Sequence, residues 1–294
     1  MFIALFVKHL QFEKKFSKHT IIAYNKDLSQ FSEYLQQINL DISGAGHVHV
    51  RSWMVDLLEK GVEAKTIHRK ISCLRSFYKF LVREQLVDEN PLLQLKVPKM
   101  PKRLPVFVEE QRMDQLLDDQ NVFGDDFSGL RDRLVIELLY GTGIRLAELI
   151  NLREEDLDSY EKSIKVLGKR NKERIIPIHT SLMCVIKEYM IKKQEQAFDD
   201  NKSSTLIVTN VGQKVYSKFI YRVVKKYLSL VSTNEKRGPH TLRHTFATAL
   251  LNRGADMNAI KELLGHASLA ATQVYTHNTV ERLKSIYKQA HPKA

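Results

Sequence analysis

A proline-rich segment constrains the fold of this chain more than any other feature of its sequence. Four of the seven prolines, Pro91, Pro98, Pro101 and Pro105, fall within "NPLLQLKVPKMPKRLP". Proline fixes the backbone and ends helices, so no helix is expected to cross this segment. A chain of 294 residues is long enough for two domains of ordinary size. We therefore predict an N-terminal domain (1–90), a linker (91–106) and a C-terminal domain (107–294).

The chain carries a marked excess of positive charge. It has 46 Lys and Arg against 34 Asp and Glu, a formal net charge of +12, with 43% hydrophobic residues to build its cores. This balance is typical of a globular protein with a polyanionic partner, either nucleic acid or an acidic membrane surface. The net charge alone does not distinguish between nucleic acid and a membrane surface as the partner.

The sequence contains no sign of export or of a membrane span. The apolar run before Lys8 is short, and no later run approaches the roughly 18 apolar residues that a span needs. Cys73 and Cys184 lack metal-ligand spacing and are predicted to be buried, reduced thiols. We expect a soluble cytoplasmic protein without a membrane partner.

Helical periodicity dominates the N-terminal domain, most clearly in "TIIAYNKDLSQFSEYL" and "KTIHRKISCLRSFYKFLVRE". In the second stretch the apolar residues recur at helical spacing and should face a core. These residues are Ile67, Ile71, Leu74, Phe77, Tyr78 and Leu81.

The opposite face of that helix is polar and basic. Such a stripe is a candidate surface for DNA phosphates, although a basic helix face is more often simply solvated. The linker adds further cations that can lie against phosphates. The candidates for DNA binding are His68, Ser72, Arg75, Lys79 and Arg83 on the helix, with Lys96, Lys99, Lys102 and Arg103 in the linker.

After the linker, "LRDRLVIELLYGTGIRLAELINL" predicts a helix to Tyr140, a glycine turn at Gly141 and Gly143, and a second helix from Arg145. A helix start presents free N–H groups, and an arginine there adds a planar fork suited to phosphate. A structural helix start with an exposed arginine is the alternative. Next, "SIKVLGKRNKERIIPIHT" predicts the one convincing hairpin, with Lys169 in its turn.

A later helix, "PHTLRHTFATALL", gathers His240, Arg243 and His244 near its start. The spacing i, i+3, i+4 puts these side chains on one face of a helix. The residues predicted to turn toward the core are Leu242, Phe246, Ala249 and Leu250.

Two more candidates follow, His266 in "LLGHAS" and Tyr275 in "TQVYTH". Each has a structural alternative, a helix cap for His266 and a half-buried aromatic for Tyr275. Taken in order, however, "GTGIRLAEL", "LGKRNKER", "HTLRHTFAT" and "LLGHASLAATQVYTH" resemble the tyrosine recombinase family. The resemblance covers nearly the whole chain, and the tail "ERLKSIYKQAHPKA" is similar to those of Xer-type members. The segment "DDQNVFGDDFSGLRDR" is longer than in the best-known relatives and blurs the choice between the two Xer paralogues.

The resemblance implies a mainly α, two-domain DNA clamp. Its N-terminal part would be a SAM-like four-helix core-binding domain. Its C-terminal part would be a mixed α+β catalytic domain with a small β-hairpin sheet and a tail helix at 279–290. The family's catalytic set falls on Arg145, Lys169, His240, Arg243, His266 and Tyr275, with Glu148 as a supporting acidic residue and Arg170 and Lys172 as further DNA-binding candidates.

These side chains suit the cleavage of a phosphodiester. Cationic donors stabilise the charge that builds on the nonbridging oxygens, a role expected of Arg145, Arg243 and His266. Tyr275 would attack phosphorus and store the bond energy as a phosphotyrosine, so neither ATP nor a metal cofactor is expected. Lys169 would protonate the departing 5′-hydroxyl, and His240 would assist the tyrosine proton. His244 lies outside the family's set and is expected to support the fold.

The resemblance also implies partners. These are double-stranded DNA with two inverted half-sites like those of dif, a tetramer that includes a paralogous recombinase, and a DNA translocase as activator. The tail would dock into a neighbouring protomer. The alternatives are a type IB topoisomerase, the integrase of a mobile element and a DNA-binding regulator without activity. The Xer-like N-terminal domain and tail argue against the topoisomerase, and the short N-terminus favours the Xer type over the integrase. The complete catalytic set argues against the regulator.

Overall fold

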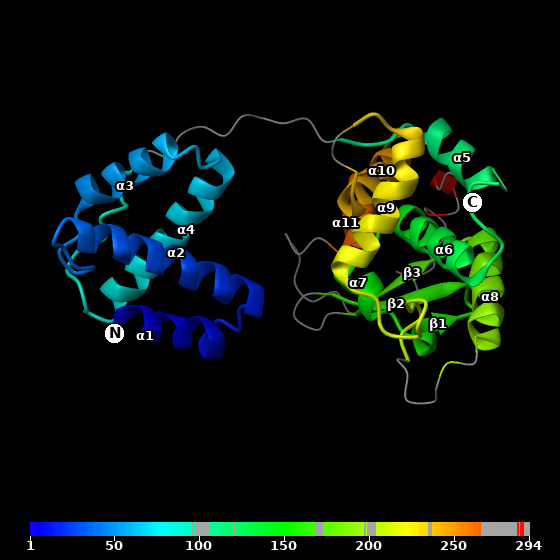
Figure 1. Ribbon diagram of the computed structural model, residues 1–294, viewed down its shortest axis with the longest axis horizontal. Coiled ribbons are helices and arrows are strands. Elements are labelled where there is room, and N and C mark those ends of the chain that lie inside the picture. The colour runs from blue at the N-terminus through cyan, green and yellow to red at the C-terminus, as the bar shows by residue number, and fades with distance from the viewer. Residues whose placement is uncertain are drawn as a thin grey trace. The chain divides into compact units, whose positions relative to one another are not determined.

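The computed structural model divides the chain into two compact units, Met1–Arg103 and Leu104–Ala294, and Figure 1 shows the helices of each. Each unit has a hydrophobic core of its own. The predicted linker, 91–106, stays a prediction because much of it lies outside the described residues. The structure describes residues 1–95, 97, 106–119, 121–168, 173–196, 198, 204–234, 237–265, 287 and 289–290.

The first unit is helical throughout its regular structure, as expected. The hydroxyl of Ser17 accepts a hydrogen bond from the Thr20 amide at 3.2 Å, which caps the start of its second α-helix. The elements are α1 (Phe2–Lys8), a π-helical turn η1 (His9–Glu13), α2 (Lys18–Gln37), α3 (His47–Glu59) and α4 (Ala64–Arg83).

The fourth helix, α4, divides into the two faces that its sequence predicts. All six apolar residues predicted for the core are buried. On the other face Ser72, Arg75, Lys79 and Arg83 are exposed, whereas His68 is half-buried. Lys70 lies on the apolar side, buried, with its Nζ atom 3.0 Å from a carboxylate oxygen of Asp27. Periodicity did not predict this buried charge, which its partner on α2 compensates.

The second unit packs helices against one another and against a small sheet. Its central helix, α6, contacts α8 and α10 and is buried along nearly its whole length. The Asp126 side chain caps the start of α6 by accepting a hydrogen bond from the Gly129 amide at 2.9 Å. The helices are α5 (Glu110–Asp118), α6 (Phe127–Thr142), α7 (Leu146–Asn151), α8 (Thr180–Glu195), α9 (Ser217–Val231), α10 (Pro239–Asn252) and α11 (Met257–Leu264).

The predicted hairpin is confirmed as strands β2 (Ser163–Leu167) and β3 (Glu173–Pro177), which pair antiparallel. The register places Leu167 opposite Glu173, at the ends of the two strands that residues 168–172 connect. A short strand that periodicity did not predict, β1 (Leu157–Asp158), follows the 3₁₀ turn η2 (Glu154–Asp156) and pairs with β2, which gives the order β1-β2-β3. The expected mainly helical fold with a small sheet is thus confirmed.

Several local expectations were wrong. Gly141 belongs to α6, so the turn before α7 is made at Gly143 and not at both glycines. Cys73 is buried as predicted, but Cys184 is exposed because it lies on the outer face of α8. The segment "KKQEQAFDDNKSS" reads in the sequence as a loose surface loop, but α8 extends to Glu195 and so includes its start.

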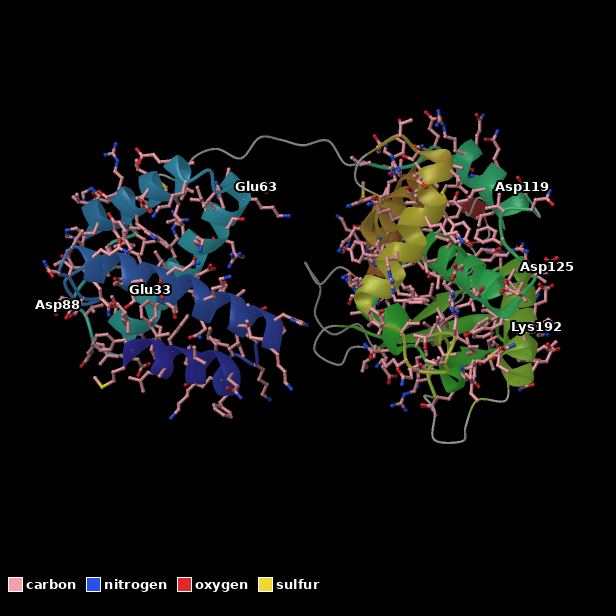
Figure 2. The ribbon with its side chains drawn as sticks, viewed as in Figure 1. Glu33, Glu63, Asp88, Asp119, Asp125 and Lys192 are labelled. Atoms are coloured by element: carbon pink, nitrogen blue, oxygen red, sulfur yellow. The ribbon has the colours of Figure 1, made fainter. Side chains whose placement is uncertain are left out.

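Charged side chains cover the surface of both units. Figure 2 labels Glu33, Glu63 and Asp88 on the first unit and Asp119 and Asp125 on the second, all exposed. Of the helices that the structure describes, none is both long and apolar enough to cross a membrane.

Candidate active site

The turn between α6 and α7 positions Arg145, the first candidate catalytic residue. Gly143 has a φ of 59°, and a Cβ atom there would lie 2.4 Å from Cδ1 of Phe246 and 2.9 Å from Cδ2 of Leu264. Only glycine allows the turn to approach α10 and α11 so closely in this conformation. Arg145 follows as the N-cap of α7, at the helix start predicted from the sequence.

Glu148, three residues further along α7, holds that arginine in place. One carboxylate oxygen accepts a bond from the Arg145 amide at 2.7 Å, and the other accepts from Nη1 of Arg145 at 2.8 Å. Arg174, from β3, donates to both oxygens at 2.8 Å, which makes a bidentate pair. The predicted supporting residue is therefore the common acceptor of two arginines. Burial raises the pKa of Glu148, but hydrogen bonds from Arg174 and Arg145 outweigh burial and lower that pKa to about 2.

Arg243 approaches the same place from α10. Its Nη1 group donates to the Gly143 carbonyl, and its Nη2 group donates to the Leu264 carbonyl at 2.7 Å. The residue is 8% exposed. Burial, together with the positive charges of Arg145 and Arg174, lowers the pKa of Arg243 to about 10. These surroundings disfavour the charged form of Arg243, and a bound anion would favour it.

The described part of the site therefore contains three guanidinium groups and one carboxylate. Within this group the guanidinium groups outnumber the carboxylate by two. The Arg145 side chain stays 27% exposed, so the excess charge reaches the surface. A phosphate is the natural complement of such a cluster, because planar guanidinium forks match its oxygens.

The two histidines of α10 lie differently from their arginine neighbour. All three lie in the predicted helix, but His240 and His244 are exposed whereas Arg243 is buried. His244 is exposed, and its expected role in supporting the fold stays a prediction. The residues predicted for the core side of α10, Leu242, Phe246, Ala249 and Leu250, are all buried.

Several predicted site residues lie outside the described residues. One of them, His266, directly follows Gly265 in the sequence, and the Gly265 carbonyl accepts a 2.6 Å bond from Nη2 of Arg145. The residues outside the description are Lys169, Arg170, Lys172, His266 and Tyr275, with the linker candidates Lys96, Lys99, Lys102 and Arg103.

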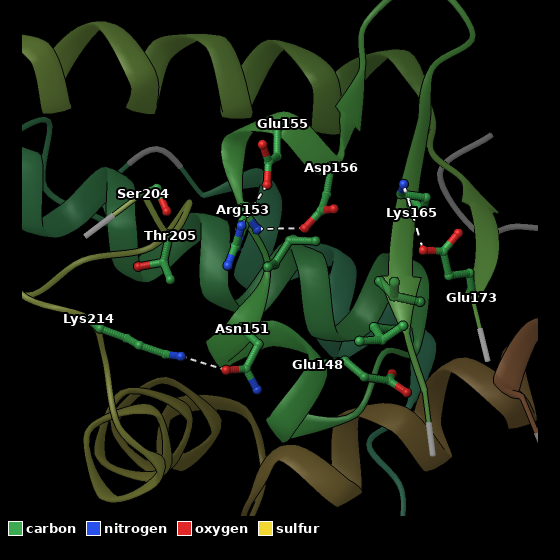
Figure 3. Close-up of a pocket in the computed structure, with 13 residues that line it drawn as sticks. Glu148, Asn151, Arg153, Glu155, Asp156, Lys165, Glu173, Ser204, Thr205 and Lys214 are labelled. Carbon is green, nitrogen blue, oxygen red and sulfur yellow. Dashed lines mark hydrogen bonds and ion pairs between the residues drawn. The ribbon is translucent and has the colours of Figure 1, made fainter. Parts of the chain in front are cut away.

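A cavity of about 600 Å³ lies beside the site, and Figure 3 shows Glu148 at its edge. The cavity is lined by three cations, Arg153, Lys165 and Lys214, and by four carboxylates. It therefore lacks the excess of positive charge found in the arginine cluster. Some of these charges pair with each other, such as Arg153 with Glu155 at 2.8 Å. This cavity is not suited to a phosphate.

The described residues of the tail pack on their own domain. Tyr287 and Ala290 are buried in a cluster with Phe246, Leu263 and neighbouring residues. The Tyr287 hydroxyl donates to the Gly141 carbonyl at 2.7 Å. In this single chain the tail therefore contacts its own α6, and the expected docking into a neighbouring protomer stays a prediction.

Sequence reasoning missed Arg174. At the start of β3 the side chains alternate between exposed and buried. Glu173 is exposed, and Arg174 lies on the same face as the buried Ile176. This spacing was the signal in the sequence that Arg174 would be buried, since residues i and i+2 of a strand share a face.

Comparisons with known proteins identify the family of this chain. The model of the phage integrase family matches residues 107–282, and that of the phage integrase N-terminal SAM-like domain matches residues 3–85. The chain therefore belongs to the phage integrase family, among its XerC-type tyrosine recombinases, site-specific enzymes that break and rejoin DNA.

Two relatives illustrate the match. Tyrosine recombinase XerC of Listeria innocua is 40% identical over 292 residues, covering 98% of this chain and 97% of the relative. XerC of Bacillus subtilis is 36% identical over 296 residues, covering 100% and 97%. Among solved structures, XerH recombinase bound to its difH substrate has a TM-score of 0.66 at 22% identity, covering 91% of this chain and 79% of that chain. That structure supports the fold.

Proposed function

We propose that this recombinase resolves chromosome dimers in the cytoplasm by exchanging strands at a dif-like site of two inverted half-sites. It would act in a tetramer with a paralogous recombinase, under the control of a DNA translocase. The observation that carries the chemistry is the group of three arginines around Glu148, with its excess positive charge next to the surface. The full-length similarity to XerC proteins supports the chromosomal role.

The cleavage step follows from the chemistry of the candidate residues. The Tyr275 oxygen attacks phosphorus, the bond from phosphorus to the 5′-oxygen breaks, and a 3′-phosphotyrosine forms. Arg145, Arg243 and His266 stabilise the charge on the nonbridging oxygens. Lys169 gives a proton to the 5′-oxygen, and His240 accepts the tyrosine proton. Attack by a 5′-hydroxyl of the partner strand reverses these steps and reseals the DNA.

The proton-donor role of Lys169 leads to a specific prediction. Lys169→Ala should slow cleavage by roughly 10² to 10⁴, the usual size of a general-acid contribution. A substrate with a 5′-thiol leaving group needs no proton and should restore the rate. The measurement is single-turnover cleavage of the two substrates. If the thiol fails to rescue Lys169→Ala but rescues Lys172→Ala, then Lys172 is the donor.

The exposed stripe of α4 leads to a second prediction, on binding. Lys79→Glu should weaken binding to one half-site and reduce the dependence of affinity on salt, because fewer counterions are released. Lys60→Glu makes the same change of charge at the exposed C-cap of α3, outside the α4 stripe, and should have little effect. Band shifts at several salt concentrations measure both. Equal effects of the two variants would make the stripe an ordinary solvated face.

Recombination itself tests the proposed role. A plasmid with two copies of the terminus site should resolve in the presence of this protein and its paralogue, and each half-site should bind one protomer. Resolution of the ends of a mobile element, with no reaction at the terminus site, would instead identify an integrase. Relaxation of supercoils without exchange would identify a topoisomerase-like activity.

A further inference from the structure

Arg174 makes contacts that link separate parts of the catalytic domain. It lies on β3 and is only 4% exposed. Its Nη groups bind Glu148 on α7, and its Nε group donates to the Leu263 carbonyl at the end of α11 at 3.0 Å. One side chain thus joins the hairpin strand to two helices, both of which adjoin candidate catalytic residues.

The end of α11 is held by three arginines in succession. The carbonyls of Leu263, Leu264 and Gly265 accept bonds from Arg174, Arg243 and Arg145 respectively. Carbonyls at a helix C-terminus lack partners within the helix and carry partial negative charge, so cations stabilise them. His266 follows this turn directly in the sequence. The arginines therefore fix the backbone up to Gly265, the residue before His266 in the sequence.

The space around Arg174 is shaped to its guanidinium. Gly265 has a φ of 64°, and a Cβ atom there would lie 3.1–3.3 Å from atoms of the Arg174 side chain. The pair with Glu148 uses a fork of two parallel bonds, and the third bond, to Leu263, leaves from another edge of the same plane. A lysine has a single ammonium group and cannot reproduce this arrangement.

We propose that Arg174 is a positioning residue that couples the β2–β3 hairpin, which carries Lys169, to Glu148 and Arg145 on one side and to the turn before His266 on the other. Through it, the proton donor and the phosphate ligands keep one common geometry. The inference rests on the proposed cleavage chemistry. Misplacing reacting groups by about 1 Å can cost roughly 10²-fold in rate, so a positional defect should be large.

The test compares Arg174→Lys with Arg131→Lys. Arg131 is also 4% exposed and pairs with a carboxylate, Asp132 at 2.8 Å, but it is absent from the arginine cluster. Single-turnover cleavage is measured on full-length protein already bound to a suicide half-site, so that unfolded protein does not enter the rate. Arg174→Lys should cleave about 10²-fold more slowly with nearly unchanged affinity, whereas Arg131→Lys should cleave at the wild-type rate.

A 5′-thiol substrate separates positioning from a defect of Lys169 alone. It should rescue Arg174→Lys only in part, because Arg145 and His266 remain misplaced. Full rescue would show that Arg174 acts through the hairpin only and would overturn the coupling. A wild-type rate for Arg174→Lys, or an equal loss in Arg131→Lys, would overturn the positioning role altogether. If wild-type protein forms no adduct, it is the proposed cleavage chemistry that fails.

Discussion

Tyr275→Phe should form no covalent complex with DNA while binding a half-site almost as tightly as the wild-type protein. The substitution removes only the oxygen that attacks phosphorus, so no phosphotyrosine can form. Because the cationic donors are unchanged, the contacts that hold the phosphate remain. The measurement is denaturing gel electrophoresis of a suicide substrate for the adduct, with a band shift for affinity.

A matched control is Tyr160→Phe, which makes the same chemical change at a residue that is 91% exposed in the second unit. It should form the adduct at the wild-type rate. A persistent adduct in Tyr275→Phe would exclude this residue as the nucleophile. Loss of binding together with the adduct would mean that the hydroxyl has a structural role.

Glu148→Gln should lower the free energy of unfolding of the catalytic domain by about 3–5 kcal/mol, because it leaves Arg174 buried without its carboxylate. For a domain of this size the loss corresponds to a fall in Tm of roughly 10 °C. Thermal and urea unfolding at neutral pH measure it. Glu155→Gln removes an exposed ion pair with Arg153 and should lower the free energy of unfolding far less than Glu148→Gln does.

The effect of Glu148→Gln should depend on pH in a defined direction. The pKa of Glu148 is lowered to about 2 in the folded protein from an ordinary value of 4.5. A lowered pKa means that the ionised carboxylate stabilises the fold fully above about pH 4.5, and this contribution is lost as the pH falls toward 2. The difference between wild-type protein and variant should therefore shrink over that range. A difference that stays constant from pH 7 to pH 3 would contradict the assigned ion pair.

Periodicity predicted the parts of the fold in which one face of an element is buried. The two faces of α4 and the core side of α10 follow directly from apolar spacing. The hairpin was visible because β-branched runs flank a turn, and Arg145 was placed correctly because a glycine turn precedes it. These features depend on neighbours in sequence, so local patterns suffice to find them.

The missed features depend on partners far apart in the chain. Lys70 is buried on α4 because Asp27 on α2 compensates its charge, and Arg174 is buried on β3 because Glu148 on α7 does the same. No local pattern in the sequence predicts which distant residue supplies the opposite charge. His240 and Arg243 were grouped by helical spacing, but the depth at which Arg243 lies was set by the carbonyls of Gly143 and Leu264.

The most direct test of the account is to identify the atoms joined in the trapped complex. Trypsin should release peptide 262–282 from the adduct, and Tyr275 is the only tyrosine in it. Mass spectrometry of the wild-type adduct should find this peptide linked through Tyr275 to a DNA 3′-phosphate, with a free 5′-hydroxyl on the other strand end. Linkage through another residue, or to a 5′-phosphate, would contradict the mechanism.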